Sequence, residues 1–235
     1  VLDVMRWTFR RPLRLRLFAI QVEHMGVGSV PIIVLSGFAT GMIMTLQMIN
    51  VLSFYNTEAF AGAGVGITLA RELAPIMTAL MLIAKNGSAI TAEIGTMKIS
   101  EQVDAMETMF VNPVQYLAVP RVWAAVVVFP VLTALSNVVG VAGSYLVSIH
   151  MRGVDRASYL HYLFQLVDPP DFMAGIIKAT VMGLIVALIS CFYGFNVRGG
   201  AKAVGDAATS SVVASSVSIL VADYIMATVL LRVLV

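Results

Sequence analysis

Charged residues are scarce in this chain of 235 residues, at 12% of the total, whereas 59% are hydrophobic. Soluble domains usually contain about 25% charged and roughly 45–50% apolar residues. Cysteine is almost absent, and with Cys191 alone no disulfide can form within the chain. The composition therefore argues strongly against a water-soluble fold and favours an integral membrane protein.

The sequence also lacks the motifs of an enzyme or a nucleotide-binding domain. Gly62, Gly64 and Gly66 are closely spaced, but no strand is expected before them and no Gly-Lys-Ser/Thr ending follows. No arrangement of Ser, His and Asp typical of nucleophilic catalysis occurs. We therefore predict no catalytic residue, no cofactor on this chain and no nucleic-acid partner, and any ATP hydrolysis would require another polypeptide.

A metal centre is not indicated either. The segment 150–171 gathers two histidines and three aspartates, but their spacing matches no metal-ligand signature. The residues concerned are His150, Asp155, His161, Asp168 and Asp171. We predict a longer outer loop there, with a short helix.

Long apolar runs are what the sequence does contain, and a membrane-spanning helix needs about 20 mostly apolar residues. Val27–Leu52 and Val122–Ile149 hold no Asp, Glu, Lys or Arg. Three more runs are interrupted by only four charged residues: Phe60–Ala84 by Arg71 and Glu72, Phe172–Val197 by Lys178, and Ala207–Leu231 by Asp223. We predict an all-α integral membrane protein with five transmembrane helices in a single domain, residues 1–235.

The distribution of basic residues predicts the orientation, because Lys and Arg accumulate in cytoplasmic segments. With a cytoplasmic N-terminus, that side carries ten of them: Arg6, Arg10, Arg11, Arg14, Arg16, Lys85, Lys98, Arg121, Arg198 and Lys202. The other side carries Arg152, Arg156 and Arg232. The first apolar run is too long for a signal peptide. We therefore expect the N-terminus in the cytoplasm and the C-terminus on the outer, periplasmic side.

Residues 1–26 combine five arginines with aromatic and aliphatic side chains. This mixture suits a helix that lies in the lipid headgroup region. An ordinary basic flank that only fixes the orientation would have a similar composition, so both interpretations stay open. Residues 1–26 are predicted here as an N-terminal interfacial helix.

Residues 91–113 form the most polar segment between two of the apolar runs, on the predicted cytoplasmic side. We expect one helix from about Ala92 to Asn112, ended by Asn112 and Pro113. Its acidic residues lie beside exposed methionines, which make an adaptable surface for a partner protein. The residues we predict to contact that partner are Glu93, Glu101, Asp104, Met106 and Glu107. A solvated amphipathic helix without a partner is the alternative.

The same segment resembles the coupling loop of ABC permeases. That loop has the pattern EAA, three residues, Gly, nine residues and Ile-x-Leu-Pro; here EQV begins at Glu101, Glu107 replaces the glycine, and Leu117, Val119 and Pro120 follow. Three longer motifs, ARELAP at 70–75, GSAITAEIGTMKISEQVDAM at 87–106 and VNP at 111–113, are similar to the MlaE/YrbE family of ABC permeases. The chain departs from the family pattern at Ala74, where glycine is usual, and at 84–86, where Gly-Arg is usual.

This resemblance implies a subunit that moves phospholipid or a similar lipid between membranes, in the bacterial inner membrane. It implies a homodimer bound to a cytoplasmic ABC ATPase, which holds ATP and Mg, and to an MCE-domain lipid-binding protein on the outer side. Some members of the family also bind a STAS-domain protein. The resemblance places lipid-contacting residues on the outer half of the first span, at Met44, Val51, Leu52 and Tyr55.

Four charged residues lie inside the apolar runs and are further candidates for a functional or structural role. Each costs about 2.5–3.5 kcal/mol at the centre of a membrane helix, so partners are expected. Arg71 and Glu72 are adjacent and project about 100° apart on an α-helix. We predict ion pairs among Arg71, Glu72, Lys178 and Asp223 that either fix helix packing or line the transport pathway.

An ion-coupled secondary carrier of a hydrophobic substrate is the alternative function, with these four charges as its relay. Such carriers usually show repeated halves, and no repeat is evident across the five runs. A membrane scaffold that transports nothing would not need charges within its spans.

Overall fold

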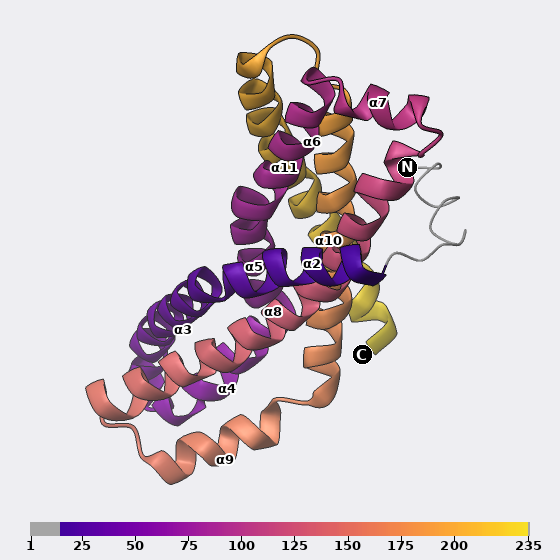
Figure 1. The fold of residues 1–235 in the computed structure, drawn as a ribbon. Helices are drawn as coiled ribbons and strands as arrows, with labels where there is room; N and C mark the ends of the chain where they lie inside the picture. The colour runs from indigo at the N-terminus through magenta and orange to yellow at the C-terminus, as the bar shows by residue number, and fades with distance from the viewer. Residues whose placement is uncertain (1–14, 235) are drawn as a thin grey trace. The chain divides into compact units, whose positions relative to one another are not determined.

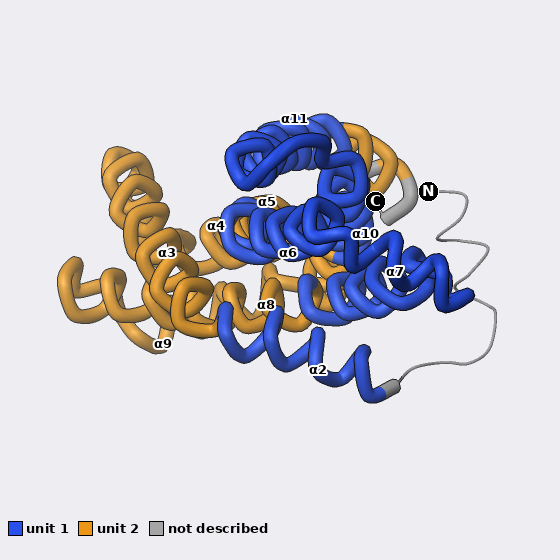
Figure 2. Tube along the Cα trace, turned by 45° about the horizontal axis from the view of Figure 1, so that its top comes forward, with its two compact units in different colours: residues 1–29, 79–129, 180–224 blue, residues 30–78, 130–179, 225–235 orange. Residues whose placement is uncertain are grey.

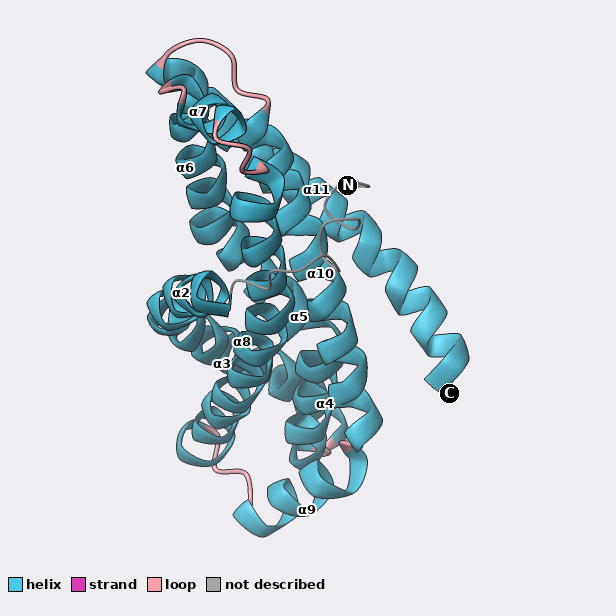
Figure 3. Cartoon of the chain, turned by 45° about the vertical axis from the view of Figure 1, so that its right-hand side comes forward, coloured by secondary structure: helices cyan, strands magenta, loops and turns pink. Residues whose placement is uncertain are grey.

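The computed structural model describes residues 15–234, and this part of the chain consists of helices joined by short loops, with no strand (Figures 1 and 3). The predicted interfacial helix of residues 1–26 lies partly outside the described residues, and its second half is helical. The elements are α2 Leu15–Gly26, η1 Val27–Ser29, α3 Val30–Leu52, η2 Ser53–Tyr55, η3 Glu58–Phe60, α4 Ala61–Thr68, η4 Leu69–Leu73, α5 Ala74–Leu82, η5 Ile83–Gly87, α6 Ser88–Ile99, α7 Gln102–Thr108, η6 Val114–Ala118, α8 Val119–Leu146, η7 Val147–Met151, α9 Arg156–Leu166, α10 Pro169–Phe195 and α11 Ala201–Leu234.

Five helical stretches are long and apolar enough to cross a membrane. They are Arg16–Tyr55, Glu58–Ile99, Val114–Met151, Pro169–Phe195 and Ala201–Leu230. The first three extend well beyond the roughly 20 residues that a bilayer requires, because short 3-10 or π-helical turns join successive α-helices without a break. The prediction of an all-α integral membrane protein with five spans is confirmed.

The prediction of a single helix over Ala92–Asn112 is wrong. The segment is divided, because α6 ends at Ile99 and Glu101 adopts a left-handed conformation with φ of 60° before α7 begins. A left-handed backbone conformation costs about 1–2 kcal/mol for most residues. A glutamate at this position therefore does not predict the break between the two helices. Asn112 does not end a helix either: its side-chain oxygen accepts the backbone N–H groups of Val114 and Gln115 and so caps η6.

The chain divides into two compact units, each assembled from three separate stretches of sequence (Figure 2). The first unit contains residues 1–29, 79–129 and 180–224, and the second contains residues 30–78, 130–179 and 225–235. In the second unit α4 packs against both α3 and α9. In the first unit α6 continues η5 and contacts α7.

Small residues bring backbones close together in the second unit. The buried side of α3 repeats every four residues, with Ile33, Gly37, Gly41, Thr45 and Ile49. A Cβ atom at Gly41 would overlap the backbone of Gly140 on α8. Membrane helices associate largely through such close van der Waals packing, since lipid supplies no hydrophobic drive between them.

We predict that Gly41→Ala lowers the free energy of unfolding by about 1–3 kcal/mol, the usual cost of overpacking. Gly205→Ala on α11 is the matched control, because nothing lies within 4 Å of the added methyl group there. The thermal unfolding midpoint of each detergent-solubilised variant is measured by size-exclusion chromatography after heating. Equal midpoints for Gly41→Ala and wild type would contradict this packing.

Candidate functional site

The segment η4, Leu69–Leu73, is a π-helical turn inserted between α4 and α5. π-Turns are rare and frequently occur at functional sites. This one carries Arg71 and Glu72, the two adjacent charges of the second apolar run. Both side chains form ion pairs with the first half of α10, in the same compact unit.

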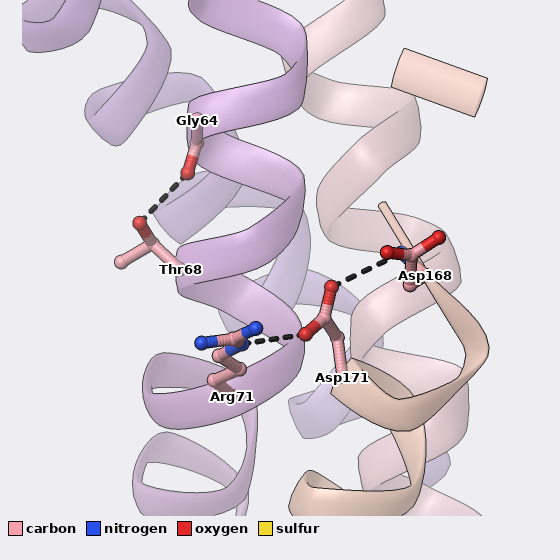
Figure 4. Close-up of polar contacts among 5 residues, drawn as sticks. All are labelled: Gly64, Thr68, Arg71, Asp168 and Asp171. Carbon is pink, nitrogen blue, oxygen red and sulfur yellow. Dashed lines mark hydrogen bonds and ion pairs between the residues drawn. The ribbon is translucent and has the colours of Figure 1, made fainter. Parts of the chain in front are cut away.

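The two ion pairs join the same two segments. Arg71 Nε lies 2.5 Å from a carboxylate oxygen of Asp171, as Figure 4 shows, and Lys178 Nζ lies 2.5 Å from a carboxylate oxygen of Glu72. The α10 partners are almost inaccessible, with 3% of the Asp171 side chain and 2% of the Lys178 side chain exposed. The partners on η4 are about 40% exposed, so each pair couples a buried charge to one that can meet solvent, lipid or another subunit.

Gly175 explains how the segments approach so closely. Asp171 and Lys178 are seven residues apart, which places them on one face of α10 two turns apart, and Gly175 lies between them. A Cβ atom at Gly175 would overlap the carbonyl oxygen of Ala70, the residue before Arg71. The backbones therefore come together at the glycine, with one ion pair on either side of it. We call Arg71, Asp171, Glu72 and Lys178 the charge clasp.

Asp171 also organises the start of α10. Its second carboxylate oxygen accepts the backbone N–H of Asp168 at 3.1 Å, which Figure 4 shows beside the Arg71 contact. On the second span, the Thr68 hydroxyl donates to the Gly64 carbonyl at 2.7 Å, so the turn leading into η4 has its own side-chain bond. Asp171 thus fixes both a helix start and the guanidinium of Arg71.

The sequence does not identify Asp171 as a partner, because the segment 150–171 is predicted as an outer loop. Pro169 and Pro170 are the signal that could have found it, since proline is favoured in the first turn of a helix and acidic side chains are favourable there. The prediction of pairs among the four intramembrane charges is confirmed for Glu72 with Lys178, whereas Arg71 pairs outside that set. Asp223 is buried on α11, within the other compact unit.

The other residues of the loop have structural contacts rather than a shared centre. Asp155 caps α9, where its carboxylate accepts the backbone N–H and the hydroxyl of Ser158, and these bonds lower the pKa of Asp155. The hydroxyl of Tyr159 bonds Ser144 at 3.0 Å, and burial raises the pKa of this phenol. Tyr159 packs against Gly62, which holds α9 on α4.

The predicted lipid-contacting residues lie in the second half of α3 and on η2. Met44, Val51 and Leu52 lie on α3, and Tyr55 lies on η2. Val51 and Tyr55 are exposed, while Met44 and Leu52 are half-buried. These side chains lie outside the buried stripe of α3 and are open to lipid or to a second subunit. Their role in a lipid pocket stays a prediction.

The predicted partner-contacting residues divide into two groups. Glu93 on α6 pairs with Arg121 of α8 at 2.8 Å. Glu101, Asp104 and Glu107 are exposed on and next to α7, where Asp104 pairs with Lys98 at 2.6 Å. Met106 is half-buried there. Glu101, Asp104 and Glu107 thus form an acidic face on α7 and its N-terminal flank, while Glu93 lies on α6 and is also exposed. The contact of these residues with a partner stays a prediction.

A groove of about 980 Å³ lies beside α7, wholly within the first compact unit. Its walls are mainly apolar, and its rim holds one basic and one acidic side chain. The residues that define it are Lys98, Val103, Glu107, Phe110, Phe192 and Phe195. Phe110 is fully exposed with φ of 57°, so a large aromatic ring projects from a strained backbone at the end of α7.

The fold defines a multi-pass helical membrane protein with paired charges inside its spans. Residues 18–229 match the model of the permease MlaE family. The chain therefore belongs to the MlaE family of membrane permeases. A probable ABC transporter permease of Rickettsia prowazekii is 39% identical over 214 residues, 91% of this chain and 83% of the relative.

Two further relatives have names that refer to lipid. The intermembrane phospholipid transport system permease protein MlaE of Haemophilus influenzae is 36% identical over 211 residues, 89% of this chain and 81% of that protein. The chloroplastic protein TRIGALACTOSYLDIACYLGLYCEROL 1 of Arabidopsis thaliana is 34% identical over 206 residues, 88% of this chain and 59% of that protein. The resemblance stated from the sequence motifs is thereby confirmed.

For the charge clasp we predict that Arg71→Met alone lowers the free energy of unfolding by about 3 kcal/mol, because the buried carboxylate of Asp171 loses its partner. Adding Asp171→Asn should recover most of this loss, since asparagine is neutral and still accepts the N–H of Asp168. Arg198→Met in an exposed loop is the control. Denaturation in detergent of the wild type, the single variants and the double variant gives a double-mutant cycle. If the losses of unfolding free energy simply add, the two residues are not coupled.

Proposed function

We propose that this chain is the transmembrane subunit of an ABC transporter that moves phospholipid or a similar lipid between membranes, driven by a separate ATPase. The match to the permease MlaE family over residues 18–229 carries this proposal. The phospholipid transport named for the Haemophilus influenzae relative supports the substrate class. The names of the relatives favour an ABC permease over an ion-coupled carrier.

The working assembly in this proposal is a homodimer in the bacterial inner membrane, with the N-terminus in the cytoplasm and the C-terminus in the periplasm. Two cytoplasmic ATPase subunits hold ATP and Mg and supply the energy. An MCE-domain protein on the outer side exchanges lipid with the permease, and a STAS-domain protein is a further candidate subunit. The permease itself catalyses no reaction.

The ATPase is proposed to dock on α7. The support for this surface is its exposure together with its chemistry: Glu101 and Glu107 supply negative charge, and Met109 and Phe110 supply large exposed apolar side chains. Exposed apolar anchors beside charges are typical of protein interfaces. The left-handed residues Glu101 and Phe110 at the two ends of α7 fix how the helix is presented.

Reversing Glu101 and Glu107 to lysine should reduce co-purification of the ATPase at least about fivefold, because charge complementarity guides association. Asp104 is left in place, since its pair with Lys98 is internal to the permease. Glu58→Lys, an exposed acidic position on η3, is the matched control. Full ATPase recovery with the double reversal, from permease that is normally inserted, would remove the coupling role of α7.

The transported lipid is proposed to bind the exposed face at the end of α3, with a second copy of the chain covering it. Met44, Val51, Leu52 and Tyr55 supply an apolar wall and one amphipathic aromatic ring near the membrane boundary. A pocket of this kind buries most of its ligand. A lipid held there should therefore survive detergent exchange, whereas a lipid that only touches the outer surface should not.

A photoreactive residue at Val51 should crosslink phospholipid after the complex has been purified and exchanged into lipid-free detergent. Val131 on α8 is the control, because it is equally apolar and 62% exposed, compared with 58% for Val51. The proposal predicts several times more crosslinked lipid at Val51. Equal yields at the two positions would show that the end of α3 is ordinary lipid-facing surface.

A further inference from the structure

A small polar network in the first compact unit joins the turn η1 to the π-turn η5. Lys85 Nζ donates to the hydroxyl of Ser29 at 3.2 Å, and that hydroxyl donates to the carbonyl of Met25 at 2.6 Å. The side-chain amide of Asn86 donates to the same carbonyl at 3.2 Å. The ammonium group of Lys85 is therefore held in place, and the protein partner that holds it is uncharged.

No carboxylate neutralises Lys85 within the described part of the chain. The ion pairs formed by lysine there are those of Lys98 with Asp104 and of Lys178 with Glu72. A lysine ammonium has three donors, and Ser29 accepts one of them. The half-buried Lys85 thus presents a positive charge and further donors to whatever lies next to it.

Glycine at position 28 leaves room for this ammonium group. A Cβ atom there would lie 2.8 Å from Lys85 Nζ, so any side chain at this position would displace the charge. Gly28 itself is exposed. Lys85 Nζ therefore lies next to the exposed backbone of Gly28, where no side chain covers it from that position.

From the ends of the apolar runs, and not from the longer helical stretch Glu58–Ile99, we infer that this ammonium lies at the level of the lipid headgroups. The charge-free run Val27–Leu52 begins one residue before Gly28, and the run Phe60–Ala84 ends directly before Lys85. Val27, next to Gly28 on η1, is 68% exposed and offers an apolar side chain to lipid. A lysine whose stem lies along apolar surface and whose head reaches the boundary is suited to an anionic lipid headgroup.

We propose that Lys85, held over Gly28 by Ser29, binds the phosphate of a membrane phospholipid whose acyl chains lie along Val27. The bound lipid bridges η1 to η5 and so steadies α2 against the second span. This site is separate from the transport pocket proposed at the end of α3 and does not rest on it.

Native mass spectrometry of the full chain, delipidated and titrated with phosphatidylglycerol, tests the proposal. Lys85→Gln should weaken lipid binding about tenfold, the scale of one charge-assisted contact, whereas Lys85→Arg should bind within about twofold of wild type. Lys98→Gln is the control, because that lysine already has a carboxylate partner. Equal binding by Lys85→Gln and wild type would overturn the assignment.

A parallel titration with inorganic phosphate separates a lipid site from a site for the free anion. Millimolar phosphate should leave phosphatidylglycerol bound, because the acyl chains supply most of the binding energy; complete displacement would overturn the lipid assignment. A phosphatidylglycerol with a photoreactive headgroup tests the wild-type protein without any substitution. Label should appear on peptides containing Gly28 or Lys85, and label confined to other peptides would contradict the site.

Discussion

The need to pair charges inside an apolar environment is the constraint on which the second compact unit depends. Arg71 and Glu72 cannot both stay unpartnered in a membrane span, and each finds a buried opposite charge on α10. The π-turn at Leu69–Leu73 and the glycine at 175 are the local features that make this possible. Backbone geometry and electrostatics therefore specify the same contact.

Close approach at glycines is the second requirement, and both units contain examples of it. Gly41 meets Gly140 in one unit, and in the other Gly194 lies against Ile94. Such contacts replace the hydrophobic drive that lipid cannot supply. Exposed residues can then contact partners. The helix α7 presents acidic side chains and the exposed Phe110, and Lys85 presents a charge that forms no ion pair with a carboxylate of residues 15–234.

The number of spans and the all-helical class could be predicted because apolar runs of about 25 residues seldom occur outside a membrane. The pair Glu72–Lys178 could be anticipated from charge alone, since few partners exist within the bilayer. Asp171 was missed, because two prolines before an aspartate occur in loops as well as in the first turn of a helix, and residues 150–171 are predicted as a loop. The break at Glu101 also escaped prediction, since left-handed glutamate has no sequence signal comparable to glycine.

Lipid transport is the proposed function, and we propose that the charge clasp takes part in it besides holding the second span against α10. The most direct measurement is ATP-driven movement of labelled phospholipid in proteoliposomes that contain the ATPase and either wild type or the Arg71→Met, Asp171→Asn double variant. The account predicts normal assembly of that variant with transport reduced at least about tenfold, because the half-exposed cation is lost while the buried site stays neutral. Normal assembly with near-normal transport would contradict it.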